Sequence, residues 1–261
     1  MAIAVAAHHR LEYALIDPER DGRVRERDRR WIVFLHEGLG SIAMWRDFPQ
    51  RLCAATAMRG LVYSRYGYGK SDPLTEPRRV DFMHDEAMHA LPELLDRLRI
   101  DDPVLLGHSD GGSIALLHAA LTPRAVAGLI VMAPHVLVED VSITSIEAAK
   151  VAYETTDLRE KLRRYHDDPD SAFRGWNDIW LHPEFRGWNI EECLQRIRCP
   201  ILALQGVDDE YGTMAQIDRI ERGATNTKVE LVRLANCRHS PHRDQPEMVI
   251  AAAKRFIDTL G

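Results

Sequence analysis

A serine stands between two glycines at Gly107–Gly111, which reads Gly-His-Ser109-Asp-Gly. An apolar run, Val104–Leu106, precedes this stretch, and a helical pattern, Ser113–Ala120, follows it. The order strand, sharp turn, helix pushes a serine hydroxyl out of a sheet, and the flanking glycines avoid clashes between the strand and the helix. The stretch therefore predicts an exposed nucleophile at Ser109.

A serine hydroxyl is a poor nucleophile at neutral pH and needs a base, usually a histidine oriented by a carboxylate. Asp208 and Asp209 follow one apolar run, and His239 follows the next. The chain order serine, acid, histidine is that of one known fold. His242 is a rival base, and we expect it to be already turning into the last helix.

The elements that must position these residues alternate between strand and helix. Such alternation predicts a mostly parallel sheet covered by helices on both faces, with the three candidates at its carboxyl edge. Strands are expected at 11–16, 31–35, 61–64, 103–107, 126–132, 200–205 and 228–234, and helices at 44–58, 82–100 with a kink at Pro92, 213–222 and 245–260.

Strand patterns are absent between residues 135 and 198. Helical patterns appear near 142–154 and 158–166, followed by a tryptophan-rich stretch. We therefore expect a core domain made of residues 1–134 and 199–261, with a helical cap, 135–198, inserted between two strands.

The composition and charge of the chain indicate which kinds of partner it can bind. The chain has 261 residues, is 45% hydrophobic and carries a net charge of −6, which is ordinary for a globular protein and offers no nucleic-acid footprint. Basic residues crowd 19–30, but acidic residues interleave with them, so we expect a solvated hairpin. No apolar run is long enough to span a membrane. The four cysteines lack Cys-x-x-Cys spacing, which favours reduced thiols in a cytoplasmic protein. We expect a small-molecule substrate and neither a membrane nor a nucleic-acid partner.

Five motifs in order resemble the α/β-hydrolase superfamily over nearly the whole chain: His36–Ser41 with Trp45, Arg65–Ser71, Gly107–Gly111, Gly206–Asp209, and His239 with Pro246-Glu247. A weaker resemblance is to capped hydrolases of aromatic-compound breakdown. The resemblance implies Ser109 as nucleophile, His239 as base and Asp209 as acid, with Asp208 as the alternative. It also implies an oxyanion hole made by the N–H groups of Asp110 and Gly38.

Two carboxylates make this chain depart from that family pattern. Glu37 replaces a common glycine, and Asp110 follows the nucleophile, so both are expected near the oxyanion hole. Either their side chains point away or one acts on substrate or water. His36-Glu37 does not continue as a zinc motif, because Gly40 stands where the second histidine would be. Neither a metal nor a cofactor is expected.

Aromatic residues near strand ends and in the cap are candidates for the pocket wall. We expect an apolar or aromatic acyl group bordered by a set of five side chains: Trp45, His135, Trp176, Trp180 and Tyr211.

The resulting hypothesis is a serine hydrolase that cleaves a carboxylic ester, thioester or activated C–C bond through an acyl-enzyme. A lyase or perhydrolase on the same fold would use the same three residues. A non-catalytic protein that binds a small ligand is the third alternative.

Overall fold

The structure is a computed structural model that describes residues 1–18 and 30–260. The mixed-charge hairpin predicted for residues 19–30 therefore falls almost wholly outside the described residues.

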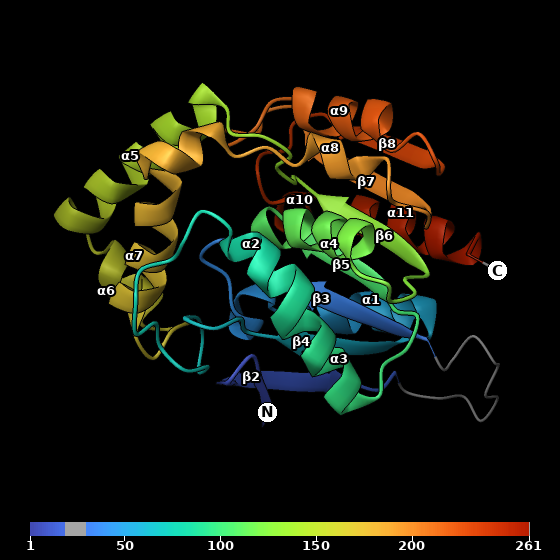
Figure 1. The fold of residues 1–261 in the computed structure, drawn as a ribbon, viewed down its shortest axis with the longest axis horizontal. Coiled ribbons are helices and arrows are strands. Elements are labelled where there is room, and N and C mark those ends of the chain that lie inside the picture. The colour runs from blue at the N-terminus through green and yellow to red at the C-terminus, as the bar shows by residue number, and fades with distance from the viewer. Residues whose placement is uncertain (19–29, 261) are drawn as a thin grey trace.

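An eight-stranded sheet forms the centre of the molecule (Figure 1). Its strand order is β1-β2-β4-β3-β5-β6-β7-β8; β1 and β2 run antiparallel to their neighbours, and the other pairs are parallel. The bounds are β1 Ala2–Ala6, β2 His9–Ile16, β3 Trp31–Leu35, β4 Arg59–Tyr63, β5 Val104–His108, β6 Gly128–Met132, β7 Ile201–Gly206 and β8 Val229–Leu234. The predicted α/β-hydrolase architecture, a mostly parallel sheet flanked by helices, is confirmed.

Helices cover both faces of this sheet. In β3, Val33 faces the cluster that includes α4, while Ile32 faces the cluster that includes α1 and α11, as the two-residue period of a strand requires. The helices of the core are α1 Phe48–Thr56, α2 Phe82–Asp85, α3 Leu91–Leu98, α4 Asp110–Leu121, α9 Ala215–Gly223, α10 Pro241–Asp244 and α11 Pro246–Asp258.

The chain between β6 and β7 forms the predicted helical insertion. It contains α5 Asp140–Thr155, α6 Leu158–Leu162, α7 Pro169–Trp180, the short helix η4 Pro183–Gly187 and α8 Glu191–Leu194. Figure 1 shows α5, α6 and α7 grouped beyond one side of the sheet. In contrast, α8 contacts α4 and α9 of the core. The domain boundaries at 135 and 198 stay a prediction.

Two local features differ from the sequence expectation. Strand β1 was not expected, because its residues lack a clear polar–apolar alternation; it forms by backbone pairing with β2. The helix expected at 82–100 is divided by one π-helical turn, η3 Glu86–Ala90. This turn comes just before Pro92, whose ring and missing N–H disturb a regular helix.

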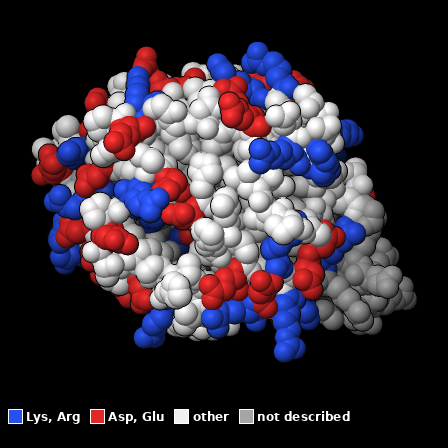
Figure 2. Space-filling model, in the orientation of Figure 1, with Lys and Arg blue, Asp and Glu red and all other residues white. Residues whose placement is uncertain are grey.

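Charged side chains of both signs are interspersed on the face of the molecule seen in Figure 2. Within the described residues, no helix combines the length and apolar character needed to cross a membrane.

Candidate active site

The turn that carries Ser109 joins β5 directly to α4. Ser109 has φ 53° and ψ −120°, a backbone conformation that non-glycine residues rarely adopt. Its N–H donates to the carbonyl of Met132 at 2.9 Å, which fixes the turn against β6. A Cβ on Gly107 would lie 2.2 Å from the Gly111 carbonyl oxygen, and one on Gly111 would lie 2.0 Å from that of Leu35. Only glycine fits at both positions, so the sharp turn follows from the sequence.

Ser109, His239 and Asp209 meet at the carboxyl edge of the sheet. Ser109 Oγ lies 3.0 Å from His239 Nε2, and His239 Nδ1 lies 2.8 Å from Asp209 Oδ1. A carboxylate only accepts hydrogen bonds, so the proton sits on Nδ1 and leaves Nε2 free to accept from the serine hydroxyl. The side chains of His239 and Asp209 are 13% and 1% exposed. The arrangement can draw a proton from Ser109.

Asp209 is held by several donors besides His239. Gln205 Nε2 donates to Oδ2 at 2.6 Å, and the N–H groups of Tyr211 and Gly212 donate to Oδ1. Burial alone would raise the pKa of Asp209, but the hydrogen bond and charge of His239, with the Tyr211 N–H, hold that pKa below its usual value. The neighbouring Asp208 is exposed.

The rival base, His242, lies elsewhere. It is 3% exposed and packs against Trp45 and Phe48, with ring centroids 4.8 and 5.5 Å away. Neither of its ring nitrogens has a hydrogen-bond partner among the described residues. Burial is the main cause that holds the pKa of His242 well below its ordinary value.

Of the two residues whose N–H groups are expected at the oxyanion hole, Asp110 follows Ser109 directly in the chain. Asp110 is the first residue of α4, where N–H groups have no acceptor within the helix. Gly38 lies in a turn closed by the bond from Gly40 N–H to the Glu37 carbonyl at 3.0 Å. A Cβ on Gly38 would lie 2.2 Å from the indole of Trp176, so this tryptophan covers the loop closely.

The side chains of the two unexpected carboxylates point in different directions. Glu37 turns toward His108 and Arg243, with its oxygens 3.5 and 3.8 Å from them. Asp110 is fully buried, and Trp180 Nε1 donates to its Oδ1 at 3.2 Å. Asp110 Oδ2 has no hydrogen-bond partner among the described residues. Burial raises the pKa of Asp110, against the opposing charges of Arg65 and Arg78.

Replacing Asp110 by asparagine should therefore change stability in a pH-dependent way. The folded protein holds a proton on Asp110 more tightly than the unfolded chain, whose pKa is about 3.9. Wild-type stability thus falls as pH rises from about 4 through the folded-state pKa. Asp110→Asn removes this cost, so its melting temperature relative to wild type should rise over that interval. Thermal unfolding across pH checks this, and a pH-independent difference would contradict it.

Two of the five predicted pocket residues lie against the ring of His239, and two more contact those two. Tyr211 and His135 lie 4.7 and 5.9 Å from the His239 ring, measured between centroids. Trp180 meets His135 edge-on at 4.9 Å, and Trp176 lies 6.5 Å from Tyr211. Burial and the neighbouring His239 lower the pKa of His135 to about 3, so its ring is neutral at working pH.

Trp45 does not join this group. It is 2% exposed and packs with Phe34 and Phe48 in the cluster on the α1 and α11 face. This environment favours a packing role for Trp45. Its place near a strand end suggested the pocket, but the sequence pattern does not reveal which face of the sheet a loop residue will cover.

Sequence reasoning missed several supporting residues. Gln205 donates to Asp209, and Glu210 Oε2 accepts the His239 N–H at 3.2 Å. Arg65, only 1% exposed, donates to the Glu37 carbonyl at 2.8 Å and binds the ring of His36, which stiffens the loop that carries Gly38. Arg65 opens one of the five motifs quoted above, whereas Gln205 and Glu210 carry no signal beyond lying near the end of a strand, where polar residues are common for other reasons.

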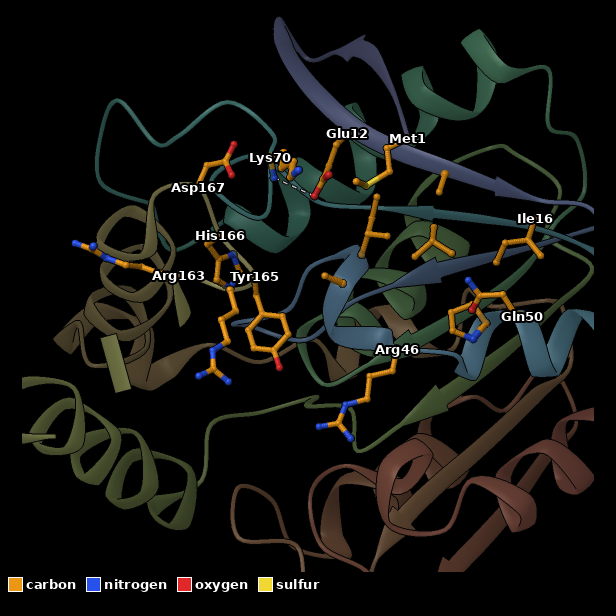
Figure 3. A pocket seen from close by; sticks show the side chains of 16 residues that line it. Met1, Glu12, Ile16, Arg46, Gln50, Lys70, Arg163, Tyr165, His166 and Asp167 are labelled. Carbon is orange, nitrogen blue, oxygen red and sulfur yellow. Dashed lines mark hydrogen bonds between the residues drawn. The ribbon is translucent and has the colours of Figure 1, made fainter. Parts of the chain in front are cut away.

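A pocket of about 550 Å³ lies apart from Ser109, between β2, the turn before α1 and the chain after α6 (Figure 3). Figure 3 shows Arg46 and Tyr165 entering it from different segments. One wall is His166, whose Nε2 donates to the Leu39 carbonyl and whose Nδ1 accepts from Gly69 N–H. Among the described residues, no group of three or more His, Cys, Asp or Glu is placed to hold a metal ion.

The sequence profile described as the alpha/beta hydrolase family matches residues 32–252. The chain is 25% identical over 254 residues to a putative carbamate hydrolase, RutD, of Caulobacter sp. (strain K31), a match covering 87% of this chain and 91% of that protein. It is 32% identical over 101 residues to the zebrafish (Danio rerio) sn-1-specific diacylglycerol lipase ABHD11, covering 39% of this chain and 30% of that lipase. This second match thus spans about a third of the relative's length.

Among solved structures, the enol-lactonase from Burkholderia xenovorans LB400 superposes with a TM-score of 0.75 at 18% identity, covering 98% of this chain and all of that one. At this identity the likeness concerns the fold.

Proposed function

Because the chain belongs to the α/β-hydrolase family, we propose that it is a serine hydrolase with Ser109 as nucleophile, His239 as base and Asp209 as acid. The observation that carries the proposal is the continuous contact from Ser109 Oγ through both ring nitrogens of His239 to Asp209, at 3.0 and 2.8 Å. The bond that the enzyme is proposed to cleave is a carboxylic ester, a thioester or an activated C–C bond.

In the proposed reaction His239 Nε2 accepts the Ser109 proton while Oγ attacks the substrate carbonyl. The Asp209 carboxylate stabilises the imidazolium that forms. The N–H groups of Asp110 and Gly38 donate to the developing oxyanion. His239 then gives its proton to the leaving group, and an acyl ester remains on Ser109. Water activated by His239 hydrolyses this ester and restores the enzyme.

The side chains around Ser109 support a small apolar or aromatic acyl group. Four aromatic rings lie at or near His239 and offer large flat surfaces to such a group: Trp176, Trp180, Tyr211 and the neutral His135. Trp176 packs against Gly38, so this indole borders the proposed oxyanion hole.

Two other reaction types remain alternatives on the same three residues. A lyase would release an acyl or carbonyl product without net hydrolysis, and a perhydrolase would use peroxide where the hydrolase uses water. A protein that only binds its ligand would not form the acyl ester at all.

Covalent labelling combined with a substrate panel tests the proposal. A fluorophosphonate should add one phosphonyl group to the wild-type chain, and peptide mass spectrometry should locate it on Ser109. The panel contains p-nitrophenyl esters, acyl thioesters and vinylogous diketones. Hydrolysis of one class identifies the bond. Labelling elsewhere, or no turnover of any class, would argue against a serine hydrolase of this type.

A further inference from the structure

His239 lies on a segment without regular structure, between the end of β8 and the start of α10. A base that must lie 3.0 Å from Ser109 Oγ therefore needs its main chain held by contacts from elsewhere. On one side, the His239 N–H donates to Glu210 Oε2 at 3.2 Å. On the other side, the carbonyl of His239 is also held by a distant residue.

The carbonyl oxygen of His239 lies 2.7 Å from Nε2 of His108, the residue just before the nucleophile. A carbonyl only accepts hydrogen bonds, so Nε2 of His108 carries the hydrogen and donates it. His108 is the last residue of β5, is 1% exposed, and its ring lies 5.2 Å from that of His239. A buried side chain of the central sheet thus holds the backbone of the base.

The other ring nitrogen of His108, Nδ1, points toward Glu37. Glu37 Oε2 lies 3.5 Å from His108 Nδ1, within ion-pair distance but without the geometry of a hydrogen bond, and Arg243 lies 3.8 Å from Oε1. A Cβ on Gly40 would lie 2.5 Å from Glu37 Oε2, so glycine at position 40 lets this carboxylate fold back toward His108. Burial alone would raise the pKa of Glu37, but His108, His242 and Arg243 hold it well below its usual value.

We propose that Glu37 and His108 are positioning residues for the catalytic base: Glu37 orients the His108 ring, and His108 holds the His239 carbonyl so that the His239 ring stays on Ser109. The proposal rests on the proposed function and adds a role for two residues outside the Ser109–His239–Asp209 set. It also gives a role to the carboxylate at position 37. The Glu37 side chain turns toward His108 and so places its negative charge away from the proposed oxyanion hole.

The test replaces His108 by phenylalanine, which keeps a flat ring but removes the donor, and by glutamine, which keeps an N–H donor. We expect His108→Phe to lower kcat by about 10- to 100-fold, because small displacements of reacting groups cost that much, while KM changes less than about twofold. His108→Gln should recover most of kcat. Glu37→Gln should give a smaller loss in kcat.

Matched controls separate positioning from general damage to the core. His118 is also a fully buried histidine that bonds a backbone carbonyl, that of Ala87 at 2.8 Å, but it lies on α4 away from His239. Glu86 is a buried carboxylate that accepts from the Tyr63 hydroxyl. His118→Phe and Glu86→Gln should lower the melting temperature and leave kcat within about twofold, as expected for changes that do not displace reacting groups.

Crystal structures of wild type and His108→Phe give a readout that does not depend on turnover. In the variant, His239 Nε2 should lie outside hydrogen-bond distance of Ser109 Oγ. An unmoved ring, an unchanged kcat, or a loss that glutamine does not recover overturns the positioning role. If wild type hydrolyses no substrate of the panel, the proposed function fails, and the position of the His239 ring still decides the positioning role.

Discussion

Replacing Ser109 by alanine should lower kcat by about 10⁶-fold, the effect found when the nucleophile of a serine triad is removed. The hydroxyl oxygen that lies 3.0 Å from His239 Nε2 is the atom proposed to form the acyl ester. Without it, His239 can still act on water, and the oxyanion donors still bind the carbonyl. A residual rate is therefore expected, and fluorophosphonate labelling should vanish.

Ser113→Ala is the matched control for that result. Ser113 is buried on α4, the helix that follows Ser109, and donates to the His135 carbonyl at 2.6 Å. Its removal takes away a hydroxyl of the same kind without touching the proposed bond-forming atom. The control should keep its labelling at Ser109 and a kcat within about tenfold of wild type, the scale of one lost hydrogen bond. Labelling of Ser109→Ala at the wild-type rate would move the nucleophile elsewhere.

Replacing Asp209 by asparagine should lower kcat by about 10⁴-fold, because the amide no longer holds the His239 ring in the tautomer that accepts from serine. Asp209 has a nearly inaccessible side chain and contacts His239 Nδ1 through both oxygens, at 2.8 and 3.0 Å. The asparagine side chain has almost the same volume, so the fold should persist. Steady-state kinetics and the melting temperature check both points.

The neighbouring residue supplies the comparison for Asp209. Asp208 is exposed, and its backbone N–H donates to the Cys237 carbonyl, a bond that survives substitution of the side chain. Asp208→Asn should leave kcat within about twofold, since surface substitutions of this kind have small effects. The opposite ranking of the two variants would transfer the role of the acid to Asp208.

The order of elements and the serine turn could be predicted from the sequence because both rest on local chemistry. Apolar runs such as 31–35 specify buried strands, and glycines at 107 and 111 admit a turn that a Cβ would block at about 2 Å. Strand β1 escaped prediction, because it is an exposed edge strand whose order comes from pairing with β2 and not from its own pattern.

Side-chain directions in the loops could not be predicted, because they depend on contacts between residues far apart in the chain. Trp45 and Trp176 are both tryptophans predicted to border the pocket, yet one packs under the α1 helix and the other covers Gly38. Likewise, His242 and His239 are three residues apart, and only the latter reaches Ser109 Oγ.

The amino-acid sequence by itself determined the α/β order, the glycine-flanked turn at Ser109 and the set of residues available for catalysis. Only the tertiary structure decided between Asp208 and Asp209 as the partner of His239, and only it turned Glu37 toward His108 and Asp110 toward Trp180. The physical reason is the distance along the chain between the residues that interact. A turn or a strand depends on neighbours along the chain, whereas the direction of a loop carboxylate depends on donors and charges that folding brings from distant segments.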